Sequence, residues 1–226
     1  KNNPPEFIQI YFDWLLNERH VSVNDTIHIG IFAHAANGGI KIDEHGWTGI
    51  EGLFACGEVT GGMHGADRIG GLSTANGLVF GQRAGRAAAD AALNSNGIVP
   101  AASCEFVSWS IEDTKAIRKQ LQTLMYEHAM VVRNEAGLTQ ALKTIKSILT
   151  DVPQIPSSDI AMISDSRILE GQLYTAIAIL EAALLRKESR GSHYREDFPA
   201  LNQTMTHPIE ISLSKNIIVG FDSSSC

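Results

Sequence analysis

Glycines gather in residues 52–86, and this stretch restricts the fold of the chain more than any other part of the sequence. They stand at positions 52, 57, 61, 62, 65, 70, 71, 77, 81 and 85. Glycine is favoured where a backbone turns sharply, adopts a positive φ or lies against another group. The pattern predicts a buried strand over 53–56, a glycine-rich turn with Glu58, a loop, and a helix with Ser73 as candidate N-cap. In α/β proteins, a strand leading through such a loop to a helix N-terminus holds a phosphate-bearing or electron-rich cofactor.

Composition narrows the class of protein. The formal net charge of −7 argues against nucleic acid as a main partner. The three cysteines are far apart, which indicates a reducing compartment and neither a disulfide framework nor a structural metal site. No apolar run is expected to approach the roughly 20 residues that span a bilayer. The chain also lacks the strand and GxGxxG that open a dinucleotide-binding unit, so we expect it to be the C-terminal part of a larger protein.

Hydrophobic periodicity predicts two regions of different character, 1–98 and 99–226. Amphipathic or small-residue helices are expected over 5–19, 73–94, 111–128, 137–149 and 166–188. Strands are expected over 23–32, 39–42 and 53–56, with a turn at 43–46 and strand-like alternation in 205–221. The fold class is therefore α/β plus α, in which three C-terminal helices pack as a bundle and a short β-like tail follows.

Six ordered motifs carry a family resemblance. They are His34-Ala-Ala-Asn-Gly-Gly-Ile40, Gly52–Glu58 (GLFACGE), His64–Ser73 (HGADRIGGLS), Val79–Gly85 (VFGQRAG), Met125–Gly137 (MYEHAMVVRNEAG) and Glu188–Pro199 (ESRGSHYREDFP). This series resembles the fumarate reductase/succinate dehydrogenase flavoprotein family, which includes L-aspartate oxidase, over about residues 30 to 199.

The resemblance implies the C-terminal portion of an FAD-dependent oxidoreductase that transfers hydride between flavin and a small carboxylate. It makes residues 1–98 the C-terminal part of a Rossmann-like FAD-binding domain, with a remnant of the capping domain at the start, and 99–226 a helical domain. The proton-transferring arginine of the family lies in a segment that has no counterpart here, so no catalytic residue is expected in this chain.

The resemblance also implies which residues contact FAD, and each has an ordinary structural alternative. The implied cofactor-binding residues are Gly57, Glu58, His64, Gly70, Gly71, Ser73 and Thr74. A carboxylate at the position of Glu58 can accept hydroxyl groups of the cofactor, whereas the alternative is a solvated loop acid. The helix start at Ser73 would favour electron density on a flavin through free N–H groups and the helix dipole, whereas the alternative is plain N-capping. His64 would lie near the flavin or serve only to build its loop.

Substrate binding is implied for Arg68 and His34. A guanidinium presents a fixed fork that matches a carboxylate, so Arg68 both attracts and orients it. The alternatives are a salt bridge from Arg68 to Asp67 or Asp90, and a core role for His34. This sequence departs from the family by having Ala35 and Asn37 in place of a large residue and Met, which predicts a wider and more polar pocket. Asp67 stands in place of the family's Asn and adds a negative charge beside Arg68.

Three further basic residues, Arg190, His193 and Arg195, are expected to form structural ion pairs with Glu188, Glu196 and Asp197. The partners implied by the resemblance are an iron-sulfur or other electron-transfer protein and a second copy of the chain, at a cytoplasmic site peripheral to the inner face of the membrane. Two alternatives stay open. The chain could be a non-catalytic structural or partner-docking module, or part of an L-aspartate oxidase-like enzyme.

Overall fold

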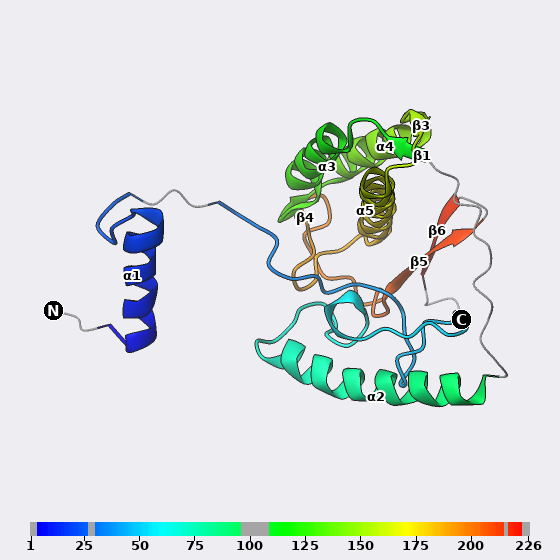
Figure 1. Cartoon of the computed structure of the whole chain (residues 1–226), viewed down its shortest axis with the longest axis horizontal. Coiled ribbons are helices and arrows are strands. Elements are labelled where there is room, and N and C mark those ends of the chain that lie inside the picture. Colours follow the sequence, from blue (N-terminus) through cyan, green and yellow to red (C-terminus); the bar gives the residue numbers. More distant parts are fainter. Residues whose placement is uncertain (1–3, 27–29, 96–108, 215–216, 223–226) are drawn as a thin grey trace. The chain divides into compact units, whose positions relative to one another are not determined.

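The structure is a computed structural model that describes residues 4–26, 30–95, 109–214 and 217–222 (Figure 1). Contacts divide it into two compact units, 1–34 and 35–226. The boundary expected between 98 and 99 lies outside the described residues, as does most of the expected linker at 95–103.

The first unit contains helix α1 (Glu6–Arg19), which matches the predicted helix. It ends at His20, whose left-handed conformation (φ 55°) lets its N–H donate to the Leu15 carbonyl. The strand predicted over 23–32 is wrong for 23–26 and 30–32, which form no strand, while 27–29 lie outside the described residues. Ser22 and Asp25 instead build a turn in which the Ser22 N–H donates to the Asp25 carboxylate at 2.7 Å. Short polar side chains that bond the local backbone in this way compete with strand formation.

The second unit begins with irregular chain rather than the predicted strands 39–42 and 53–56. Each forms a single bridge, Ile40 with Thr60 and Trp47 with Phe54. A strand needs a hydrogen-bonded neighbour along its length, and these segments pair at one position only. The predicted turn at 43–46 is present, since the Gly46 N–H donates to the Asp43 carbonyl at 3.1 Å. A 3-10 turn, η1 (Gly57–Val59), follows.

Helix α2 (Leu72–Asn94) matches the predicted helix but begins one residue early. Its N-cap is Gly71, at φ 86°, and no side chain caps it, so the expectation that Ser73 is the N-cap is wrong. Glycine takes this left-handed conformation without steric cost, which moves the helix start ahead of the serine. The face formed by Gly77, Gly81 and Gly85 meets no other backbone within the described residues; a methyl group at Gly81 would only touch the Cys56 sulfur at 4.0 Å.

Three long helices share the main hydrophobic core: α3 (Thr114–Ala129), α4 (Glu135–Asp151) and α5 (Ile160–Leu185). They lie against one another in Figure 1. Their fully buried side chains include Leu138, Ile145, Leu169, Leu173 and Leu180. Each helix begins at an acidic or amide N-cap (Asp113, Asn134 and Asp159) whose side chain accepts a backbone N–H of the first turn.

Helix α5 is the centre of this core. By length and composition it is the one helix in the described part of the chain that could cross a membrane. Seven of its residues are buried here, mainly among the side chains of the other two helices. One third of its apolar window is buried, and the core helix of a protein without membrane spans passes the same test of length and composition.

Short strand pairs complete the described structure. β1 (Trp109–Ile111) pairs antiparallel with β3 (Gln154–Pro156), and β2 (Val132–Arg133) pairs parallel with β4 (Tyr194–Arg195). β5 (Ile209–Ser214) and β6 (Ile217–Asp222) form an antiparallel hairpin, in agreement with the strand-like tail expected at 205–221. The β2–β4 pair fixes the loop after α5 to the turn that precedes α4.

Candidate functional site

The turn that carries Glu58 is built by its own backbone and by a buried hydroxyl. Gly57 has φ 80°, and the Thr60 hydroxyl, in a residue only 4% exposed, donates to the Gly57 carbonyl at 2.6 Å. The exposed Glu58 carboxylate accepts the Ala36 N–H at 3.0 Å. This bond ties the turn to the segment that follows His34, so Glu58 is more than a solvated loop acid.

Arg68 lies in the loop that leads into α2. Its guanidinium donates to the Ser73 hydroxyl at 2.7 Å, and its backbone N–H donates to the Asp67 carboxylate at 2.9 Å. The alternative salt bridges to Asp67 or Asp90 are not formed; the ion pairs found in the described residues do not include Arg68. The structure therefore brings together a half-buried cation and a helix N-terminus without a side-chain cap. Both attract electron density and negative charge.

Gly70 and Gly71 border this helix start, and nothing lies within 4 Å of the position a methyl group would take at either. The Thr74 N–H donates to the Gly71 carbonyl at 3.2 Å within the first turn. Four of the candidate cofactor residues, Gly70, Gly71, Ser73 and Thr74, are thus close together in the sequence and exposed.

Asn76 lies in α2, one turn after Ser73. His64 lies beside it, with the His64 Nε2 3.5 Å from the Asn76 Nδ2. The Asn76 side chain is buried, and its Oδ1 has no hydrogen-bond partner in the described structure. A buried acceptor without a donor is costly, so the site is suited to a bound group that donates a hydrogen bond. Sequence reasoning missed Asn76; its signal was a polar residue among the glycines and apolar residues of the helix.

His34 is the last residue of the first unit, and its side chain is exposed. Its assignment to substrate binding stays a prediction. The core alternative does not fit this exposure.

A second segment reaches the loop of Arg68 from the helical region. Gly191, at φ 56°, lies so near the Ala66 carbonyl that a methyl group on it would be 2.3 Å from that oxygen. The next residue, Ser192, donates its N–H to the same carbonyl at 3.3 Å. Asn37 completes the contact, since its Nδ2 donates to the Ser192 hydroxyl at 3.2 Å and to the Asp67 carboxylate at 3.3 Å. Asn37 stands out in the sequence only as a departure from the family, and Ser192 is not among the predicted site residues.

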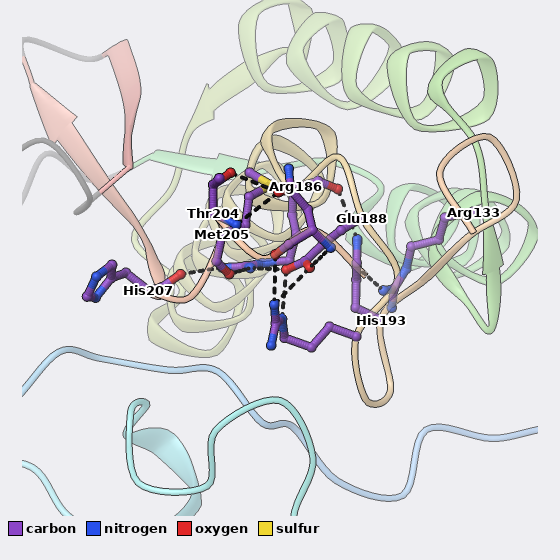
Figure 2. A network of polar contacts seen from close by, with 9 residues as sticks. Arg133, Arg186, Glu188, His193, Thr204, Met205 and His207 are labelled. Carbon is purple, nitrogen blue, oxygen red and sulfur yellow. Dashed lines mark hydrogen bonds and ion pairs between the residues drawn. The ribbon is translucent and has the colours of Figure 1, made fainter. Parts of the chain in front are cut away.

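The segment around Gly191 is held by the polar network in Figure 2. The fully buried Glu188 carboxylate accepts from Arg186 at 2.7 Å and from Arg190 at 2.8 Å and 3.0 Å. Arg186 also donates to the carbonyls of Met205 and His207, which fixes the chain leading to β5. Burial favours the uncharged form of Glu188, but the hydrogen bonds that its carboxylate accepts from Arg190 and Arg186 outweigh this effect and lower its pKa to about 2.

His193 and Arg195 anchor the other side of the same segment. The Arg133 guanidinium lies 2.7 Å from His193 Nδ1, and His193 Nε2 lies 3.2 Å from the Arg186 carbonyl, so the neutral imidazole with its proton on Nε2 satisfies both contacts. Burial, followed by the charge of Arg133, lowers the pKa of His193 to about 4. Arg195 is fully buried and forms a bidentate pair with Asp197, with both contacts at 2.7 Å.

The expected structural ion pairs are thus confirmed for Arg190 with Glu188 and for Arg195 with Asp197. Two of the expected partners differ. His193 faces Arg133, and Glu196 accepts from the Asn134 side chain and not from a basic residue of the cluster. Two of its arginines, Arg190 and Arg195, are thus paired with acids of the same segment, as expected of a structural support.

Comparisons with known proteins place these motifs. The family described as "Fumarate reductase flavoprotein C-term" matches residues 118–214, and that described as "FAD binding domain" matches residues 17–74. The fumarate reductase flavoprotein subunit of Haemophilus influenzae is 32% identical over 199 residues, which cover 78% of this chain and 32% of that protein. L-aspartate oxidase of Mycobacterium leprae is 40% identical over 172 residues, covering 74% and 30%.

A solved structure of quinol-fumarate reductase with menaquinol molecules aligns with a TM-score of 0.71 at 27% identity, covering 88% of this chain and 38% of the other. The chain spans about a third of the length of both curated relatives named above. The Haemophilus influenzae relative is named as a flavoprotein subunit. The segment matched to the FAD binding domain contains the turn of Glu58 and the start of α2.

Proposed function

The chain belongs to the fumarate reductase/succinate dehydrogenase flavoprotein family, and on this premise we propose that it is the C-terminal part of an FAD-dependent oxidoreductase that transfers hydride between flavin and a small carboxylate. Members of this family are FAD-dependent oxidoreductases. The observation that carries the proposal is Arg68, whose guanidinium lies 2.7 Å from the Ser73 hydroxyl at the uncapped start of α2. A carboxylate bound there would lie next to the groups proposed to meet the cofactor.

The residues present suit FAD. When bound, FAD supplies a ring that accepts or donates hydride. Gly70, Gly71, Ser73 and Thr74 leave the start of α2 open to an electron-rich group, and Glu58 offers carboxylate oxygens to hydroxyl groups. His64 lies next to Asn76, whose buried Oδ1 lacks a donor within the described residues. These side chains would bind and orient the cofactor.

The substrate residues proposed here are Arg68 and His34. Arg68 would orient the carboxylate through its planar fork of donors, and its held position would limit the substrate to one approach. Proton transfer is assigned to no residue of this chain.

The finer architecture belongs to the same proposal. Residues 1–98 would form the end of a Rossmann-like FAD-binding domain with a remnant of the capping domain, and 99–226 a helical domain whose three-helix core carries the support of Arg68. The Haemophilus relative is named as one subunit of its enzyme, and the solved fumarate reductase is linked to quinol, which together support a complex of several proteins. We therefore propose an electron-transfer partner, such as an iron-sulfur protein, and a place at the cytoplasmic face of a membrane.

A second candidate is an L-aspartate oxidase-like reaction, which the 40% identity to the Mycobacterium leprae enzyme favours. Oxygen-dependent peroxide formation from an amino acid would distinguish it. A purely structural or docking role is the remaining alternative, and it would leave the purified flavoprotein without activity on carboxylates.

The test is the flavoprotein that contains this chain, purified with FAD and assayed with fumarate, succinate and L-aspartate. Arg68→Ala is expected to raise KM for the carboxylate about tenfold to a hundredfold, because a charge-assisted hydrogen bond is lost. Arg68→Lys should recover only part of this, since an ammonium lacks the fork. Arg83→Ala is the matched control, an exposed arginine further along α2. Equal kinetics for Arg68→Ala and Arg83→Ala would refute the assignment of Arg68.

A further inference from the structure

Three segments far apart in the sequence meet beside Arg68. Asn37 bridges Asp67 and Ser192 with its amide group, at 3.3 Å and 3.2 Å. The Asn37 Oδ1 is buried and has no partner within the described residues, so the amide is oriented by its two donor contacts alone. Because the Nδ2 protons point at two acceptors, exchanging the amide nitrogen and oxygen would place an acceptor against the Asp67 carboxylate. The orientation of Asn37 is therefore defined by Asp67.

The contact between the two loops is made by backbone. The Ser192 N–H and hydroxyl both approach the Ala66 carbonyl, at 3.3 Å and 3.4 Å. The positive φ of Gly191 and its distance to Ala66 leave no room for a side chain there. Because the loop of Gly191 is in direct contact with the loop of Ala66, a shift of the first loop must also shift the second.

Ser192 lies in a rigid segment. Glu188 and Arg195, both fully buried, anchor the chain on either side of it. Arg195 donates to the Ala183 carbonyl near the end of α5 at 2.7 Å, so the segment is fixed to the helical core. The position of Ser192 is therefore set by that core and not by solvent-exposed loop.

Asp67 connects Asn37 to Arg68 through hydrogen bonds. One of its oxygens, Oδ1, accepts from both Asn37 and the Arg68 backbone N–H, at 3.3 Å and 2.9 Å. At its other end Arg68 is held by the Ser73 hydroxyl. We propose that Asn37, Asp67 and Ser192 are positioning residues that hold Arg68 in its carboxylate-binding orientation against the helical core. This inference rests on the proposed function, which supplies the substrate that Arg68 binds, a small carboxylate.

Two substitutions of Asp67 separate the effect of its hydrogen bonds from the effect of its negative charge. Asp67→Asn keeps an oxygen that accepts from Asn37 and from the Arg68 N–H, and it removes a negative charge near the carboxylate site. Its KM for the carboxylate should equal or fall below that of the wild type. Asp67→Ala removes the charge and both contacts, and its KM should rise about fivefold with little change in kcat, because the loss of two hydrogen bonds outweighs the favourable loss of the charge. If charge alone mattered, both variants would lower KM.

Ser192→Ala and Asn37→Ala test the remaining contacts in the flavoprotein with FAD bound. Each should raise KM about fivefold and accelerate amide hydrogen exchange at Arg68. The matched control is Ser147→Ala, which removes a 2.7 Å serine–aspartate bond on α4 and should change neither quantity.

Amide hydrogen exchange at Arg68 also distinguishes a failure of this inference from a failure of the proposed function. If the wild type binds FAD but no small carboxylate, the proposed function fails, and exchange at Arg68 still decides whether the three residues hold its loop. The inference is overturned if Asp67→Ala lowers KM as Asp67→Asn does. It is also overturned if Arg68 exchange is unchanged in both Ser192→Ala and Asn37→Ala.

Discussion

Replacing Gly191 with alanine tests the contact between the two loops most directly. Gly191 has φ 56°, a conformation that costs an L-residue about 1–2 kcal/mol. A methyl group there would also lie 2.3 Å from the Ala66 carbonyl oxygen, and ordinary contact between such atoms begins at about 3.4 Å. The loops must therefore separate by about 1 Å, and overpacking of this kind costs about 1–3 kcal/mol. We expect Gly191→Ala to lower the free energy of unfolding by about 2–5 kcal/mol in total.

Two other glycines separate these contributions. Gly65 has a similar φ of 61° but open space around it, so Gly65→Ala should cost only the conformational part, about 1–2 kcal/mol. Gly171 lies within α5 with open space, and Gly171→Ala should stabilise by about 0.5–1 kcal/mol because alanine favours helix. Urea unfolding of the purified protein, followed by circular dichroism, measures all three. A loss for Gly191→Ala no larger than that for Gly65→Ala would refute the steric argument.

The remaining predictions concern one pair of helix starts and one histidine. Asp159 accepts two N–H groups at the start of α5, so Asp159→Ala should lower the free energy of unfolding by about 1 kcal/mol. Ser73→Ala removes no cap of α2 and should lower it by less than about 0.5 kcal/mol in the same urea assay. Equal losses for the two variants would contradict the assignment of the caps. The folded state lowers the pKa of His193 from 6.5 to about 4, so the unfolded chain binds a proton first as the pH falls, and stability should decline between about pH 6.5 and 4. His193→Gln should flatten that decline in urea unfolding measured at several pH values, and an unchanged slope would show that His193 is not its source.

Helices were predictable because their pattern is local. The repeat of Leu138, Leu142 and Ile145 on α4 defines a core face without reference to any other segment, and these residues are buried as expected. The start of α2 is predicted one residue late, because serine is a common N-cap and the many glycines of this stretch do not mark which one caps the helix. Strands 39–42 and 53–56 failed for the opposite reason, since a strand depends on a neighbour that apolar character alone does not specify.

The candidate site was predictable only in part. Arg68 and Ser73 are both predicted site residues, but the hydrogen bond between them is not predicted, because an arginine in a sequence suggests acidic side chains as its partners. The ion pairs of Arg190 and Arg195 were expected, since their acidic partners lie two residues away. Asn37 and Ser192 could not be paired from the sequence, because no periodicity links positions in different structural regions.

The bond between Asn37 and Ser192 joins residues 155 positions apart. Contacts of such separation close long loops, and they form late in folding because the closure entropy must first be offset by local structure. The three C-terminal helices can gather by shorter-range contacts before this bond exists. We therefore expect Arg68 to acquire its final orientation only at the end of folding, so that a partly folded chain would have the helical core but not a functional carboxylate site.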